Sequence, residues 1–170
     1  MKIIFLIIYY LLAKHLPSTS MPLGKISNFF RTLLCRFIFK KIKKNSVVKR
    51  GVYFGNGKNI IIGENSQLGE NCRLPNNIVI GDNVMMGLES LFLGVKHKIS
   101  DKKIPFINQG YENVDPIIIK DNVWIGARVV VLPGIKIEKN CIIAAGSILT
   151  KSTIPNSVYA GVPAIKIRDI

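Results

Sequence analysis

The chain has 170 residues, enough for one structured domain with a single hydrophobic core and a small appendage. Apolar residues make up 48% of it, which excludes an intrinsically disordered protein. Its 3 cysteines are widely spaced and form no CxxC pair, which argues against a disulfide framework or a zinc site, and its net charge of +14 is unevenly distributed.

The positive charge belongs to the N-terminal segment. Before Glu64 the chain carries 12 Lys and Arg residues and no acidic residue, whereas the rest carries 12 basic and 10 acidic residues. Residues 3–13 form an apolar run that is too short for a helix to cross a bilayer. The KHLPSTS that follows has no small-x-small cleavage site, so we expect no export and a cytoplasmic location.

Residues 26–44 mix apolar and basic side chains in a pattern typical of an amphipathic helix with a cationic face. The apolar set is Phe29, Phe30, Leu33, Leu34, Phe37 and Ile38, and the basic set is Arg31, Arg36, Lys40, Lys41, Lys43 and Lys44. Residues 1–44 have two open interpretations: a cap on the end of the following fold, or peripheral contact with the anionic inner face of the plasma membrane. We expect a combination in which membrane contact has the larger part. Nucleic acid is not an expected partner, because no recognition motif accompanies the charge.

From Ile62 onward, large apolar residues recur every six positions. The first run is Ile62, Leu68, Leu74, Ile80, Met86 and Phe92, and the second is Ile119, Ile125, Val131, Ile137, Ile143 and Leu149. A companion repeat stands four residues later and includes Cys72 and Cys141, for which we expect buried packing. A period of six fits neither a helix nor an ordinary strand, but it fits a triangular coil of about eighteen residues per turn. We predict an all-β parallel β-helix over residues 51–170, preceded by a helical leader over residues 1–50.

The two runs are out of phase by three residues, so the coil is interrupted between them. The interruption, at about residues 96–116, is long, polar and free of the repeat, and we expect it to protrude. Long irregular loops on rigid scaffolds are usually functional. This loop holds His97, one of only 2 histidines in the chain; the other, His15, lies in the leader.

The second run carries a family likeness. Residues 119–150 (IKDNVWIGARVVVLPGIKIEKNCIIAAGSILT), with Lys151 and the tail AGVPAIKIR, resemble the bacterial hexapeptide-repeat acyltransferases. Within that family the chain looks most like the sugar O-acetyltransferases that act on galactosides, maltose or capsular polysaccharides. The resemblance covers residues 51–168. It implies a left-handed coil, a homotrimer with an active site between neighbouring prisms, and acetyl-CoA as the acetyl donor.

The resemblance also implies roles for single residues. His97, at the root of the loop, would take the proton of an acceptor hydroxyl, a task that suits imidazole at neutral pH. Ala127 and Ala145 would let the pantetheine of CoA approach the backbone. The sequence TK at 150–151 and the basic residue at 168 match family positions that bind CoA, so Thr150, Lys151 and Arg168 complete the expected cofactor site.

Two parts of the expected site stay open. The Asn that binds the acceptor in the family falls on Gly69 here, which leaves Asn71 as a weak substitute. Several acids could orient the imidazole, and the sequence does not choose among Asp82, Glu89, Asp101, Glu112 and Asp115.

We therefore predict an acetyl-CoA-dependent O-acetyltransferase for a sugar hydroxyl in capsular, exopolysaccharide or lipopolysaccharide biosynthesis. An acetyltransferase for a small-molecule alcohol such as an antibiotic (the xenobiotic type) stays open, because the loop does not reveal the acceptor. A non-catalytic structural β-helix is the third alternative, but it leaves His97 and the Thr150–Lys151 pair without a role. No metal is expected, since γ-carbonic anhydrases on this fold need three His ligands and the repeat region has only one His.

Overall fold

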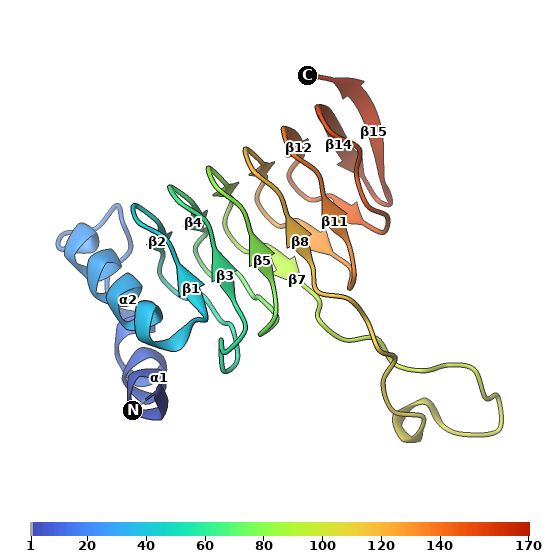
Figure 1. The fold of residues 1–170 in the computed structure, drawn as a ribbon, viewed down its shortest axis with the longest axis horizontal. Coiled ribbons are helices and arrows are strands. Elements are labelled where there is room, and N and C mark those ends of the chain that lie inside the picture. Colours follow the sequence, from blue (N-terminus) through green and yellow to red (C-terminus); the bar gives the residue numbers. More distant parts are fainter. Residues whose placement is uncertain (1) are drawn as a thin grey trace.

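The computed structural model describes residues 2–170, and it shows a prism of short strands with helices at one end and a long arm on its side (Figure 1). Nearly all strands are two residues long and pair in parallel with their equivalents one turn away. This architecture confirms the predicted parallel β-helix.

The strands form three walls. The first wall contains β1 (Lys41–Ile42), β3 (Ile61–Ile62), β5 (Val79–Ile80), β8 (Ile118–Ile119) and β11 (Lys136–Ile137). The second contains β2 (Val47–Val48), β4 (Gln67–Leu68), β6 (Met85–Met86), β9 (Trp124–Ile125), β12 (Cys141–Ile143), β14 (Ser157–Gly161) and β15 (Ala164–Asp169). The third contains β7 (Leu91–Phe92), β10 (Val130–Val131) and β13 (Ile148–Leu149). Among the named strands of residues 2–170, β14 and β15 are the one antiparallel pair, in a hairpin that closes the far end.

The repeat positions form the core of the prism. In the first wall Ile62, Ile80, Ile119 and Ile137 stack in one column, because their strands pair in that register. All twelve apolar repeat residues are at most 4% exposed. Cys72 and Cys141 are buried among them, as predicted. Each coil therefore buries its apolar side chains against those of the coils stacked above and below it.

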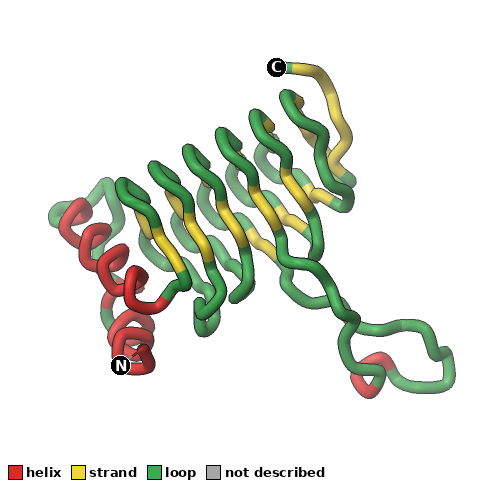
Figure 2. The backbone as a smooth tube through the Cα atoms, in the orientation of Figure 1, coloured by secondary structure: helices red, strands yellow, loops and turns green. Residues whose placement is uncertain are grey.

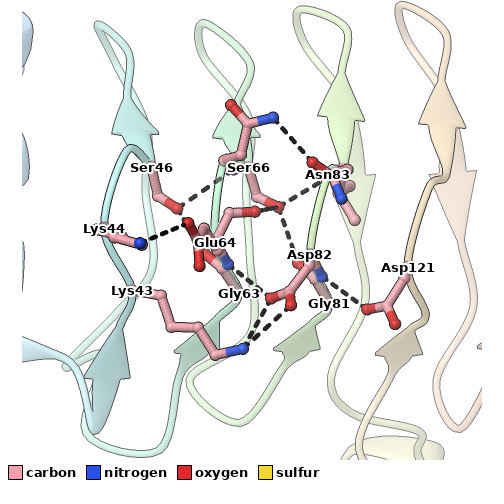
Figure 3. Close-up of polar contacts among 12 residues, drawn as sticks. Lys43, Lys44, Ser46, Gly63, Glu64, Ser66, Gly81, Asp82, Asn83 and Asp121 are labelled. Carbon is pink, nitrogen blue, oxygen red and sulfur yellow. Dashed lines mark hydrogen bonds and ion pairs between the residues drawn. The ribbon is translucent and has the colours of Figure 1, made fainter.

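The corners between the first and second walls are tied together by polar side chains (Figure 3). The carboxylate of Asp82 accepts the N–H of Glu64 at 2.7 Å, and the carboxylate of Asp121 accepts the N–H of Asp82 at 2.7 Å. Lys43 Nζ lies 3.0 Å from Asp82 Oδ1. The hydrogen bond from Glu64 and the ammonium of Lys43 hold the pKa of Asp82 below its usual value.

The β-helix begins earlier than the predicted residue 51. Helix α2 (Gly24–Ile38) ends before Lys44, the expected end, and β1 starts at Lys41. Ile42 pairs with Ile62, so the first turn has 20 residues, two more than the 18 between Ile62 and Ile80. These extra residues break the six-residue phase, which explains why the repeat starts at Ile62 in the sequence.

The N-terminal helices cap the open end of the prism (Figures 1 and 2). The cap consists of α1 (Lys2–Leu11), the short helix η1 (Ala13–His15) and α2. Tyr9 is fully buried and donates its hydroxyl to the carbonyl of Val52 at 2.8 Å. The capping interpretation of the leader is therefore confirmed. Among residues 2–170, none of the helices combines the length and apolarity that crossing a bilayer requires.

Arg31 does not lie on a cationic surface, and that prediction was wrong. Its side chain is 0% exposed, because its guanidinium finds enough acceptors inside the cap to be buried. It donates to the carbonyls of Val48 (3.2 Å), Ala13 (3.2 Å), Leu16 (3.1 Å) and Pro17 (3.0 Å), and to the side chain of Asn28. Arg31 thus joins α2 and η1 to the first coil.

Candidate active site

The arm leaves the prism after β7 and returns before β8, where the sequence predicts a protruding loop (Figures 1 and 2). Its stem is a short antiparallel ladder. The N–H of Lys98 donates to the carbonyl of Gly110 at 3.0 Å, and that of Glu112 to the carbonyl of Lys96 at 2.7 Å. These bonds fix the position of the residues between them.

His97 lies between the two stem bonds, directly opposite Tyr111. The two residues form an isolated antiparallel bridge, and their ring centroids are 4.4 Å apart at an interplanar angle of 43°. Facing side chains of such a pair limit each other's orientation. Sequence reasoning missed Tyr111, because its only signal is an aromatic residue in an irregular loop.

The candidate acids do not reach His97. Among the described residues no hydrogen bond or ion pair joins the imidazole to another side chain. Glu112 pairs with Lys96 at 2.7 Å, and Glu89 pairs with Arg128 at 2.7 Å. Asp82 and Asp101 accept backbone N–H groups. Within one chain the ring of His97 is therefore held by Tyr111.

The arm also exposes several apolar side chains among its polar ones. His97 is exposed, and so are Val95 (63%), Phe106 (65%) and Ile107 (84%). The short helix η2 (Phe106–Asn108) forms the tip, held by Gln109, whose amide donates to the carbonyl of Ile104 at 2.7 Å.

Ala127 and Ala145 lie together at the corner between the second and third walls. The N–H of Gly146 donates to the carbonyl of Ala127 at 2.8 Å, so the two corners stack. A Cβ on Gly126 would lie 2.5 Å from the backbone N of Ala145, so only glycine fits at position 126. Ala127 is half-buried and Ala145 is exposed. Together they form a smooth strip where a ligand can approach the backbone.

Thr150 and Lys151 lie on the same edge of the prism as the root of the arm. Phe92, Val131 and Leu149 stack in one column of the third wall, so the residues after each of them follow one edge. Thr150 and Lys151 are both exposed. Within one chain, His97 therefore stands on a different edge from Ala127 and Ala145.

Arg168 and Asn71 lie apart from these groups. Arg168 is exposed on β15, opposite Val158, and its Nη1 donates to the carbonyl of Asp169 at 3.1 Å. Asn71 occupies a corner with a φ of 56°, a left-handed conformation that Asn tolerates, and its N–H donates to the carbonyl of Arg50 at 2.9 Å. These contacts give Asn71 a role in the turn.

A groove of about 820 Å³ runs along the outside of the second wall. Met85 and Trp124 line its floor, 44% and 49% exposed, and stacked asparagines line one side. The amide of Asn65 donates to Asn83 at 2.8 Å, and that of Asn122 donates to Asn140 at 2.9 Å. Trp124 is thus available to a ligand or a neighbouring chain.

Comparison with known proteins identifies the repeat. Residues 116–151 match the family model of the bacterial transferase hexapeptide (six repeats). Galactoside O-acetyltransferase of Escherichia coli K12 is 37% identical over 144 residues, which are 82% of this chain and 68% of that protein. Further relatives from Schizosaccharomyces pombe and Staphylococcus aureus align over 63 residues, 30% and 32% of their own length.

Solved structures agree over nearly the whole chain. A maltose O-acetyltransferase from Clostridium difficile 630 has a TM-score of 0.80 at 31% identity, covering 99% of this chain and 86% of that one. A galactoside acetyltransferase in complex with coenzyme A has a TM-score of 0.81 at 32% identity, covering 99% of this chain and 80% of that one. The likeness therefore extends over the cap and the prism.

Proposed function

The chain belongs to the bacterial hexapeptide transferase family and is an acetyltransferase that uses acetyl-CoA, and we propose that it acetylates a sugar hydroxyl with His97 as the general base. The acceptor class is a sugar of a capsular polysaccharide, an exopolysaccharide or a lipopolysaccharide. Relatives named for galactoside and maltose support a sugar acceptor. We place the enzyme in the cytoplasm, with residues 1–44 as the part that contacts a membrane.

The observation that carries the proposal is the fixed position of His97. The stem of the arm holds it against Tyr111, and its ring nitrogens form no hydrogen bond within the described residues. His97 would accept the proton as the hydroxyl oxygen attacks the thioester carbonyl, and would return it to the departing CoA thiolate. General-base catalysis of this kind contributes about 10² to 10⁴-fold.

The rest of the proposed site holds acetyl-CoA. The strip of Ala127 and Ala145 admits the pantetheine close to the backbone, where N–H and C=O groups can bond to its amides. Thr150 and Lys151 follow the edge from which the arm leaves, and Lys151 and Arg168 would face the phosphates. Asn71 remains a weak proposal for the acceptor.

The proposed assembly is a homotrimer. The arm's exposed Phe106 and Ile107 favour a neighbouring copy as their cover. Within one chain His97 lies on a different edge from the Ala127–Ala145 strip, and a neighbouring copy would bring its own strip close to His97. We therefore place each active site between two copies.

The test measures release of the CoA thiol from acetyl-CoA with a panel of glycans and small alcohols. His97→Ala should lower turnover by at least about a hundredfold, while its free energy of unfolding stays within about 1 kcal/mol of the wild type. The matched control is His15→Ala, because His15 is exposed in the cap and contacts the carbonyl of Tyr10. Equal turnover in the wild type and His97→Ala would refute the mechanism, and turnover only with small alcohols would refute the sugar acceptor.

A further inference from the structure

The first half of helix α2 buries polar side chains and exposes apolar ones, whereas its C-terminal half buries Leu34, Cys35 and Ile38. Its buried face includes Ser27, Asn28, Arg31 and Thr32, each at most 8% exposed. Its outer face includes Ile26 (65% exposed), Phe29 (67%) and Phe37 (49%). A helix on a water-facing surface has the opposite arrangement.

Hydrogen bonds inside the cap fix this inverted orientation. The hydroxyl of Thr32 accepts the N–H of Val48 at 3.0 Å, and the amide of Asn28 donates to the hydroxyl of Thr19 at 2.8 Å. The Arg31 guanidinium adds its bonds to four backbone carbonyls. Rotating α2 to bury its apolar side would leave these polar groups without partners. The outward apolar side is therefore part of the native structure.

Helix α1 extends the exposed apolar surface. Its inner side packs Tyr9 against the first coil, and its outer side exposes Ile3 (71%), Ile7 (51%) and Leu11 (78%) at a spacing of four residues. The rings of Phe5 and Phe37 stack with centroids 4.5 Å apart, which joins the two helices. We name the outer residues of α1 and α2 the cap face: Ile3, Ile4, Ile7, Leu11, Ile26 and Phe29.

Cations without acidic neighbours accompany the cap face. Lys2, Lys25, Arg36 and Lys40 are exposed, and none takes part in an ion pair within residues 2–170. The sequence has no acidic residue before Glu64. An apolar helix surface with Lys and Arg around it complements anionic lipid headgroups.

A second copy of the chain fits the cap face less well than an anionic lipid surface does. The segment before Glu64 carries 12 Lys and Arg residues and no acidic residue, so two cap faces brought together would repel each other. The helices also lie beyond the end of the prism, whereas the arm projects from its side (Figure 1).

We propose that the cap face inserts into the headgroup region of an anionic phospholipid bilayer, with α1 and α2 lying in the plane of the membrane. The apolar residues of the cap face contact the acyl chains near the surface, and the four free cations contact lipid phosphates. This inference rests on the membrane contact proposed above for residues 1–44, and it adds the residues and the lipid class of that contact; it does not depend on acetyl transfer.

The experiment is co-sedimentation of the full chain with vesicles of phosphatidylglycerol and phosphatidylcholine, compared with vesicles of phosphatidylcholine alone. The wild type should sediment with the anionic vesicles only. Ile26→Ser/Phe29→Ser should weaken the partition by at least about tenfold. The matched control is Ile165→Ser, since Ile165 is equally exposed (64%) at the opposite end of the prism. Lys25→Glu/Arg36→Glu should also weaken it.

Each alternative has its own outcome. No sedimentation with anionic vesicles, or equal sedimentation of the wild type and the Ile26→Ser/Phe29→Ser variant, would overturn the proposal. A lower mass of that variant in light scattering would also overturn it, because the face would then join copies of the chain. Release of the CoA thiol, measured without vesicles, tests the acetyltransferase proposal separately.

Discussion

His97 has an aromatic neighbour where many catalytic histidines have an acidic one. Tyr111 faces it across the stem with ring centroids 4.4 Å apart, and the nearest acid in the stem, Glu112, is engaged by Lys96. Proton transfer depends on where the imidazole nitrogen points, and small displacements of a catalytic group cost much of the rate. In the proposed mechanism Tyr111 would position the imidazole of His97 through its ring rather than its hydroxyl.

Tyr111→Ala should lower kcat by about tenfold or more, because the imidazole loses the surface that orients it. Tyr111→Phe keeps the ring and should stay near the wild type. Steady-state kinetics with saturating acetyl-CoA checks both variants, and the KM for acetyl-CoA should not change. A Tyr111→Phe variant as slow as Tyr111→Ala would assign the role to the hydroxyl instead.

Lys151 is exposed and has no ion-pair partner within the described residues, so its ammonium is free to meet a phosphate. Lys151→Ala should raise the KM for acetyl-CoA with little change in kcat, because the contact is made equally in the ground and transition states. Lys139→Ala, a change at another surface lysine, is the control. An unaltered KM would remove Lys151 from the proposed site.

At the scale of elements, the corners of the coil are where charge contributes to stability. Asp82 accepts the Glu64 N–H and pairs with Lys43, and both contacts lower the pKa of its carboxyl (Figure 3). A carboxyl whose pKa is lower in the folded chain stabilises the fold above its unfolded pKa of about 3.9, and this contribution disappears as the pH falls through the lower folded value.

Asp82→Asn keeps an acceptor for the Glu64 N–H but removes the charge. The melting temperature of the wild type should therefore fall more steeply than that of the variant as the pH drops from about 5 to below 4. Thermal unfolding followed by circular dichroism across this range checks the difference. Parallel curves for the two proteins would show that the Asp82 carboxylate does not contribute.

The capping elements show what the sequence could not predict. The alternation of Phe29 and Phe37 with Arg31 and Arg36 indicates an amphipathic helix, but it does not say which side is buried. Arg31 is buried because carbonyls of η1, the following turn and β2 surround it, and those acceptors meet only in the folded chain. The local sequence therefore predicts that α2 is a helix, and hydrogen bonds to the rest of the fold determine which side of it is buried.

At the scale of the whole molecule, the six-residue period predicted the prism, its core and the place of the arm. Every apolar repeat residue from Ile62 to Leu149 is buried. The first coil was missed because two extra residues between Ile42 and Ile62 shift its phase. The Tyr111–His97 contact was missed because pairing within an irregular loop leaves no periodic signal. A six-residue period in the sequence predicts the elements that repeat, whereas a single contact such as that between Tyr111 and His97 is found only in the structure.

His97 and the Ala127–Ala145 strip lie on two different edges of the prism. His97 follows the third wall, and Ala145 follows the second, so one chain alone does not bring them together. In a cyclic trimer the same two surfaces would meet at every boundary between copies. We therefore propose an acetyltransferase site that takes its imidazole from one copy and its cofactor strip from the next.

Complementation between two inactive variants tests whether the site is shared between copies. His97→Ala lacks the base, and Ala145→Glu obstructs the cofactor strip while leaving an exposed position outside the core. The two chains, co-expressed with different tags and purified as mixed trimers, should regain about one third of wild-type release of the CoA thiol, since each mixed ring has one intact boundary out of three. Mixed trimers as inactive as each variant alone would contradict the account.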